Sequence, residues 1–124
     1  MRYLLDSNIV IAAILASGES LRARMAACDE DDLATSAVAY AEVAHGSLRG
    51  KPPPIEILDR FLVDIPVLPF DRAAARAYAA LPFIRGRYDR LIAAHALSLE
   101  LTVVTNNMVH FAQVPGLAVE NWTE

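Results

Sequence analysis

Length, composition and charge exclude several classes of protein. Its 124 residues are enough for one domain, residues 1–124, and too few for two. A formal net charge of −4 at pH 7 excludes a protein that holds nucleic acid by bulk positive charge, and although 55% of the residues are hydrophobic, no apolar run reaches the roughly 18 to 20 residues that a membrane helix needs.

Strand-like and helical segments alternate along the whole chain. The predicted strands are residues 3–5, 32–35, 65–68, 101–105 and 117–119, and the predicted helices are residues 9–15, 21–28, 37–49, 55–63, 72–81, 89–100 and 108–111. Such alternation predicts an α/β fold with a mostly parallel sheet. The β-branched strand 101–105 is expected inside that sheet, and strand 65–68, which carries a proline, at its edge.

The first strand stops at a carboxylate. Asp6 stands between the apolar strand 3–5 and the apolar helix 9–15, at the edge of a parallel sheet where ligands bind. Asp is also a common cap of a helix, so capping is the alternative role for Asp6. Ser7 is a candidate for a supporting contact to a bound water, with helix capping as the favoured role.

Three further polar residues are expected at the same edge. Glu42 lies one to two turns into the helix that Ser36 is placed to cap, Asp89 begins the most clearly helical segment, and Asn107 follows strand 101–105. Because the carboxyl ends of parallel strands share one edge, these side chains and Asp6 can converge. Asn107 is a candidate for orienting a phosphate or a water, although Asn after a strand is often only a turn residue.

Converging carboxylates require a partner. Two of them about 4 to 5 Å apart repel by about 3 to 4 kcal/mol at an effective dielectric constant near 20, so such a cluster shares a proton or holds a cation. Carboxylates and water are the ligands of Mg²⁺ or Mn²⁺. The chemistry expected of Asp6, Glu42 and Asp89 is metal-assisted attack of water on a phosphodiester.

Basic residues offer a local contact for a polyanion. Ten of the eleven cationic residues are arginines, and Arg85, Arg87 and Arg90 fall close together. The guanidinium group matches phosphate oxygens, so this cluster is a candidate RNA contact, and a solvated basic loop is the alternative. His95, which lies between alanines in the middle of a helix, is interpreted as a packed residue rather than a base.

The cysteine count and the apolar fraction indicate the cellular compartment and the presence of binding partners. No secretory signal is visible, and the single cysteine, Cys28, excludes an internal disulfide, so a reducing cytoplasm is expected. The high apolar fraction suggests a surface covered by a second subunit or another partner, whereas close packing of the many alanines is the other explanation.

Taken together, the motifs resemble a known family. They are residues 3–8 (Tyr-Leu-Leu-Asp-Ser-Asn), 41–43 (Ala-Glu-Val), 88–97 (Tyr-Asp-Arg-Leu-Ile-Ala-Ala-His-Ala-Leu), 104–111 (Val-Thr-Asn-Asn-Met-Val-His-Phe), 114–117 (Val-Pro-Gly-Leu) and 120–122 (Glu-Asn-Trp). In this order, over nearly the whole chain, they resemble the PIN-domain ribonucleases, and among these the VapC-like toxins of prokaryotic toxin–antitoxin pairs.

The resemblance implies a three-layer α/β/α fold and a Mg²⁺- or Mn²⁺-dependent endoribonuclease that acts on cellular RNA. It also implies a homodimer and inhibition by a small VapB-like antitoxin that inserts near the active site. By position, Asp6, Glu42 and Asp89 match the acidic ligands of the family. Asn107 falls where many members have a further Asp, which leaves one or two metal ions open. A catalytically inactive PIN-fold module that binds RNA or another partner is the alternative function.

Overall fold

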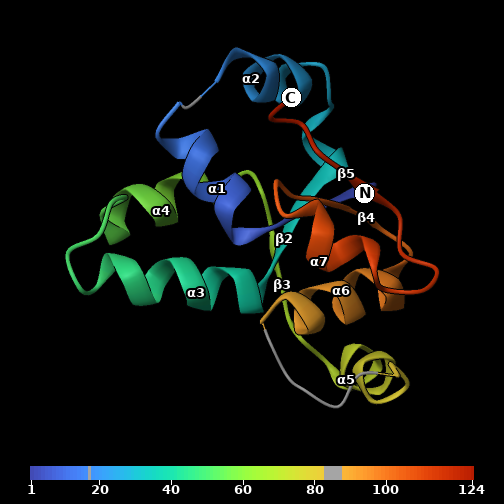
Figure 1. Cartoon of the computed structure of the whole chain (residues 1–124). Coiled ribbons are helices and arrows are strands. Elements are labelled where there is room, and N and C mark those ends of the chain that lie inside the picture. The colour runs from blue at the N-terminus through green and yellow to red at the C-terminus, as the bar shows by residue number, and fades with distance from the viewer. Residues whose placement is uncertain (17, 83–87) are drawn as a thin grey trace.

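The computed structural model describes residues 1–16, 18–82 and 88–124 (Figure 1). Within these residues the chain forms a sheet of five strands: β1 (Tyr3–Leu5), β2 (Leu33–Ser36), β3 (Val67–Leu68), β4 (Thr102–Val104) and β5 (Val119–Glu120). The strand order is β3-β2-β1-β4-β5, and every neighbouring pair is parallel. The expected edge position of the proline-flanked strand β3 and the interior position of β4 are confirmed.

Helices connect the strands and cover both faces of the sheet. They are α1 (Ser7–Ile14), α2 (Glu19–Ala26), α3 (Ala37–Ser47), α4 (Ile55–Phe61), α5 (Arg72–Ala79), α6 (Tyr88–Leu99) and α7 (Met108–Ala112), with a short 3₁₀ turn at Glu30–Asp32. Most of these bounds lie within two residues of the ranges predicted from the sequence. The alternation of elements along the chain therefore produces an α/β fold.

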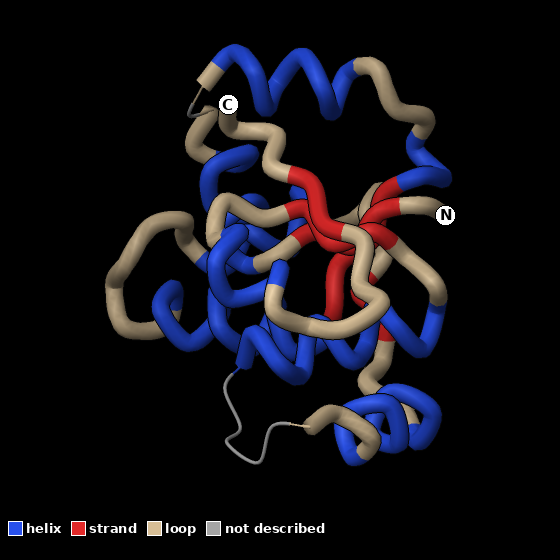
Figure 2. The backbone as a smooth tube through the Cα atoms, turned by 45° about the vertical axis from the view of Figure 1, so that its right-hand side comes forward, coloured by secondary structure: helices blue, strands red, loops and turns tan. Residues whose placement is uncertain are grey.

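The two faces of the sheet carry separate cores because successive side chains of a strand point to opposite sides. Tyr3 and Leu5 of β1 belong to the core cluster that includes residues of α1, α2 and α4. Leu4, between them, belongs to the cluster built with α6 and α7. In Figure 2 the strands accordingly run between helices on either side. This is the three-layer α/β/α arrangement that the sequence predicted.

Helix α5 stands outside these layers and packs on α6 (Figure 1). Asp71 is the N-cap of α5, because its Oδ1 accepts a hydrogen bond of 3.0 Å from the backbone N–H of Ala74. Ser36 begins α3 in the same manner, accepting from the N–H of Val38 at 3.0 Å. None of the helices in the described part of the chain is long and apolar enough to cross a membrane.

Candidate active site at the carboxyl edge of the sheet

The parallel pairing places the carboxyl ends of the strands at one edge. Asp6 directly follows β1, and Thr105 directly follows β4. Helix α3 begins directly after β2 and carries Glu42, while Asp89 lies in the first turn of α6. The elements therefore bring the predicted residues to one edge of the sheet, as expected for a doubly wound topology.

Asp6 is buried and held through both carboxylate oxygens. Only 2% of the residue is exposed. Its Oδ1 accepts from the backbone N–H of Ser7 at 2.8 Å, and its Oδ2 accepts from the hydroxyl of Thr105 at 2.7 Å. Burial raises the pKa of Asp6, while the hydrogen bonds from Thr105 and Ser7 lower this pKa and the negative charge of Asp89 raises it.

The capping role predicted for Ser7 is wrong. Asp6 is the N-cap of α1, with extended backbone angles, and Ser7 is the first helical residue. The helix begins two residues earlier than the apolar pattern indicated, because the carboxylate of Asp6 accepts a hydrogen bond from the N–H of Ser7. Asp6 thus caps the helix and also lies at the site. The hydroxyl of Ser7 lowers the pKa of both Asp6 and Glu42, which places it beside both acids.

Glu42 is the least satisfied of the acids. Its Oε1 is buried and has no hydrogen-bond partner among the residues that the structure describes. Burial, and then the negative charges of Asp6 and Asp89, together raise the pKa of Glu42 from 4.5 to about 7. A buried acceptor without a donor is destabilising, so this oxygen is suited to a cation or a proton.

Asp89 is held by two side chains from the segment after β4. Its Oδ2 lies 2.9 Å from Nδ1 of His110 and accepts a hydrogen bond of 3.2 Å from Nδ2 of Asn107. Asn107 also fixes the end of the strand, because its backbone N–H donates to the hydroxyl oxygen of Thr105 at 2.9 Å. The structure therefore brings Asn107 together with Asp89.

The three acids are close enough for each to affect another. Asp89 raises the pKa of Asp6, and both of them raise the pKa of Glu42. Yet within residues 1–16, 18–82 and 88–124, no group of three or more His, Cys, Asp or Glu side chains is already gathered to hold a metal ion. The three side chains fit Mg²⁺ or Mn²⁺ as ligands, since all of them offer carboxylate oxygens. One of these oxygens, Oε1 of Glu42, has no hydrogen-bond partner among the described residues.

Of the three arginines predicted to bind RNA, Arg90 is the one that lies within the described residues. Arg85 and Arg87 lie outside the described residues. Arg90 donates from its guanidinium to the backbone carbonyl of His110 at 3.2 Å and to Oε1 of Gln113 at 3.3 Å. Arg90 therefore ties the start of α6 to α7, next to the acids.

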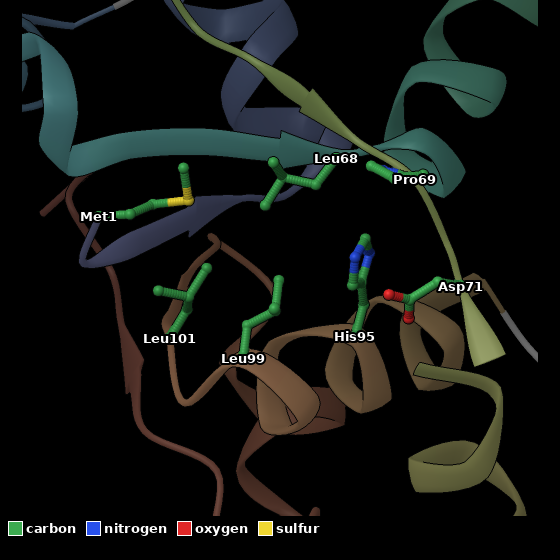
Figure 3. A pocket seen from close by; sticks show the side chains of 7 residues that line it. All are labelled: Met1, Leu68, Pro69, Asp71, His95, Leu99 and Leu101. Carbon is green, nitrogen blue, oxygen red and sulfur yellow. The ribbon is translucent and has the colours of Figure 1, made fainter. Parts of the chain in front are cut away.

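A pocket that does not include Asp6, Glu42 or Asp89 is lined mostly by apolar side chains. It has a volume of about 410 Å³ and is lined by Met1, Leu68, Pro69, Asp71, His95, Leu99 and Leu101 (Figure 3). His95 is 1% exposed, its Nδ1 lies 2.8 Å from the hydroxyl oxygen of Ser36, and burial lowers its pKa against the opposing influence of Asp71. The prediction that His95 is a packed residue is confirmed.

Two contacts of the site are not indicated by the sequence patterns. Thr105 ends a predicted strand and His110 belongs to one of the family-like motifs, and in the structure they contact Asp6 and Asp89. The position of Thr105, immediately after an interior strand and two residues before Asn107, was the available signal for the first. Nothing in the spacing of His110 indicated that its ring turns toward α6.

The fold and the site define an α/β domain that gathers carboxylates at the carboxyl edge of a parallel sheet. The family model described as PIN domain matches residues 3–117, and the chain belongs to this family. The resemblance drawn from the sequence is thereby confirmed.

Curated relatives match over nearly the full length. The tRNA(fMet)-specific endonuclease VapC of Shigella flexneri is 31% identical over 134 residues, with 99% of each chain covered. The ribonuclease VapC2 of Rickettsia felis is 31% identical over 132 residues, with 98% of each covered. A chain in the crystal structure of VapBC2 from Rickettsia felis bound to a DNA fragment from their promoter has a TM-score of 0.86 at 30% identity, covering 98% of this chain and 99% of that one.

Proposed function

We propose that this protein is the toxin of a toxin–antitoxin pair and acts in the cytoplasm as a metal-dependent endoribonuclease that hydrolyses phosphodiester bonds of RNA. Membership of the PIN domain family supports this, as do relatives named endonuclease or ribonuclease VapC that match over nearly the whole chain. The alternative function, an inactive module of the same fold that binds RNA or another partner, needs no set of coupled acids.

The state of Glu42 is the observation that favours catalysis. A module that only binds has no use for a carboxylate whose Oε1 is buried without a partner beside two other acids. Such an arrangement is destabilising by itself and is typical of functional sites. Asp6, Glu42 and Asp89 are therefore the proposed catalytic residues.

The same three side chains are the proposed ligands of Mg²⁺ or Mn²⁺. When bound, such an ion neutralises the acids, polarises the scissile phosphodiester and activates the attacking water. Asp6, Glu42 and Asp89 would hold the ion through their carboxylate oxygens, one of which, Oε1 of Glu42, is buried and has no hydrogen-bond partner among the described residues. Asp6 is the fixed member, since both its oxygens are already held.

The pKa values of Asp6 and Glu42 depend on different surroundings. Burial raises the pKa of Asp6, and the hydrogen bonds from Thr105 and from the N–H of Ser7 offset part of this effect by favouring the carboxylate form that binds a cation. Glu42, with a pKa of about 7, holds a proton on its carboxyl group in a large share of molecules at neutral pH and must release it to ligate an ion. Binding of the ion is therefore coupled to proton release from Glu42.

The proposed partners are a small VapB-like antitoxin and a second copy of the chain. The solved relatives from Rickettsia felis and Salmonella typhimurium are VapBC complexes. Leu15, Leu48 and Val63 are 48%, 71% and 77% exposed, which is apolar surface that a partner would cover. Light scattering on the purified protein tests the dimer, and a mass near 13.5 kDa at high concentration would contradict it.

Cleavage-site mapping tests the proposed function. Total RNA is incubated with Mg²⁺ and either the wild-type protein or the Asp6→Ala or Asp89→Asn variant, and the new 5′ ends are sequenced. We expect discrete cuts with the wild type and none with either variant. The matched control is Asp64→Asn, because Asp64 is exposed and lies in the loop after α4. Folded variants that cut as well as the wild type would favour the inactive-module alternative.

A further inference from the structure

The contact between His110 and Asp89 joins the shortest α-helix of the described chain to the proposed site. Helix α7 spans only Met108–Ala112. Even so, its position is well defined, because Phe111 is 0% exposed in the core formed with α6. The backbone carbonyl of His110 in addition accepts a hydrogen bond from Arg90 at 3.2 Å. The backbone that carries the imidazole is thus fixed independently of the ring.

The ring of His110 and the amide of Asn107 both contact Asp89. Nδ1 of His110 and Nδ2 of Asn107 lie 2.9 Å and 3.2 Å from the same oxygen, Oδ2 of Asp89. A carboxylate oxygen only accepts, so this contact is a hydrogen bond in the tautomer of His110 that carries its proton on Nδ1. Nδ2 of Asn107 lies 2.9 Å from that nitrogen. In this tautomer both nitrogens are donors, so they do not hydrogen-bond to each other and share Oδ2 of Asp89 as their acceptor. Neither of them uses Oδ1.

We infer that His110 is a positioning residue that holds the carboxylate of Asp89 for cation binding through its Nδ1–H. This inference rests on the proposed function, because it assigns to Asp89 the role of a ligand. Side chains that hydrogen-bond to the ligands of a metal set their orientation, and their loss typically weakens metal binding by about 10- to 100-fold. Asn107 continues to donate to Asp89 when the imidazole is removed, so we expect the lower end of this range.

The ring is not needed for packing. The side chain of His110 is 40% exposed, and that of Asp89 is 23% exposed. With Phe111 and the bond from Arg90 retained, α7 stays docked without the imidazole. A purely structural role would therefore leave metal affinity unchanged, whereas a positioning role changes metal affinity and leaves the fold intact.

The experiment measures Mn²⁺ binding to the full chain by isothermal titration calorimetry, together with cleavage of a short RNA at several Mn²⁺ concentrations. The variants are His110→Ala and His110→Asn. The Asn amide places an N–H donor at the same distance along the side chain as Nδ1, so it preserves the proposed contact. Val109→Ala is the matched control, since Val109 is the preceding residue of α7 and is 70% exposed. Thermal unfolding followed by circular dichroism checks the fold of each variant.

We expect His110→Ala to weaken Mn²⁺ binding by about tenfold and to regain cleavage when Mn²⁺ is raised, with KM for RNA unchanged. His110→Asn should bind within about threefold of the wild type. Unchanged Mn²⁺ affinity in His110→Ala overturns the inference, and so does a His110→Asn variant as weak as His110→Ala. A wild-type protein that neither binds Mn²⁺ nor cuts RNA overturns the proposed function and this inference with it. Wild-type binding and cleavage with an unaffected His110→Ala overturns the inference alone.

Discussion

The hydroxyl of Thr105 donates a hydrogen bond of 2.7 Å to Oδ2 of Asp6, a residue 99 positions earlier in the chain. The same hydroxyl oxygen accepts from the backbone N–H of Asn107 at 2.9 Å. Thr105 is fully buried. One hydroxyl therefore links the end of β1 to the turn after β4, and it orients an acid of the proposed site while satisfying a backbone donor.

Replacing Thr105 by Val should be destabilising and should reduce cleavage. Val keeps the shape of Thr but leaves Oδ2 of Asp6 and the N–H of Asn107 without their partner, which costs about 1 to 3 kcal/mol for buried groups. Urea unfolding and the rate of RNA cleavage measure the two effects. Thr105→Ser, which keeps the hydroxyl, is the control and should retain more of both. Equal stability of Thr105→Val and the wild type would show that the hydroxyl contributes nothing.

The stability of the metal-free protein should depend on pH through Glu42. Burial, and then the charges of Asp6 and Asp89, raise the pKa of Glu42 from 4.5 to about 7 in the folded protein. The folded state therefore binds more protons than the unfolded state between these values. The contribution of Glu42 to stability is complete below about pH 4.5 and is lost as the pH rises through about 7.

The Glu42→Gln variant cannot ionise and should lose this dependence. We expect it to be more stable than the wild type at about pH 8, by about 1 to 2 kcal/mol after allowing for partial exposure, and to be inactive on RNA. Differential scanning calorimetry in chelator at fixed ionic strength compares the two proteins across pH. Subtracting one curve from the other removes the contributions of the other carboxylates. Parallel curves would contradict the raised pKa of Glu42.

The sequence predicted which residues reach the edge of the sheet. Asp6 and Asn107 are placed by the strands they follow, and Asp89 by the start of a strongly helical segment, so the parallel topology is enough to gather them. Glu42 needed one further step, the position of Ser36 as a helix cap, which the structure confirms. Local sequence patterns and the parallel topology of the sheet are therefore enough to predict where these four residues lie.

The same patterns could not predict how the acids are held. The contacts of Thr105 with Asp6 and of His110 with Asp89 depend on side-chain torsions and on how α7 packs against α6, which no local pattern encodes. The choice between Asp6 and Ser7 as the cap failed for a related reason. Both residues are good caps, and a shift of one residue is settled only by the backbone angles of the folded chain.

Metal removal should abolish cleavage and lower stability together. We expect no cuts in the presence of a chelator and full recovery with Mg²⁺ or Mn²⁺. An ion that binds only the folded state at 100 times its Kd stabilises that state by about 2.7 kcal/mol, so the Tm of the wild type should rise with Mn²⁺. Asp6→Asn should show no such rise, while Asp64→Asn should behave like the wild type. Cleavage that persists in chelator would exclude the proposed role of the metal.

Neutralising the arginines should weaken RNA binding and reduce its dependence on salt. Each phosphate contact to single-stranded RNA contributes about 0.7 to the slope of log K against log salt concentration. The Arg85→Gln/Arg87→Gln double variant should therefore lower this slope by about 1 to 1.5 if both residues contact phosphates. Fluorescence anisotropy with a labelled RNA, measured on the inactive Asp89→Asn background, gives the slope.

Arg90 requires a separate variant, because its guanidinium also bonds to the carbonyl of His110 and to Gln113. Arg90→Gln should lower both the salt slope and the Tm, whereas the double variant should lower the slope alone. Arg60→Gln is the matched control, since Arg60 is exposed on α4. A slope that stays the same in the double variant would remove Arg85 and Arg87 from the RNA interface. A lowered Tm with an unchanged slope would assign Arg90 to the docking of α7 on α6.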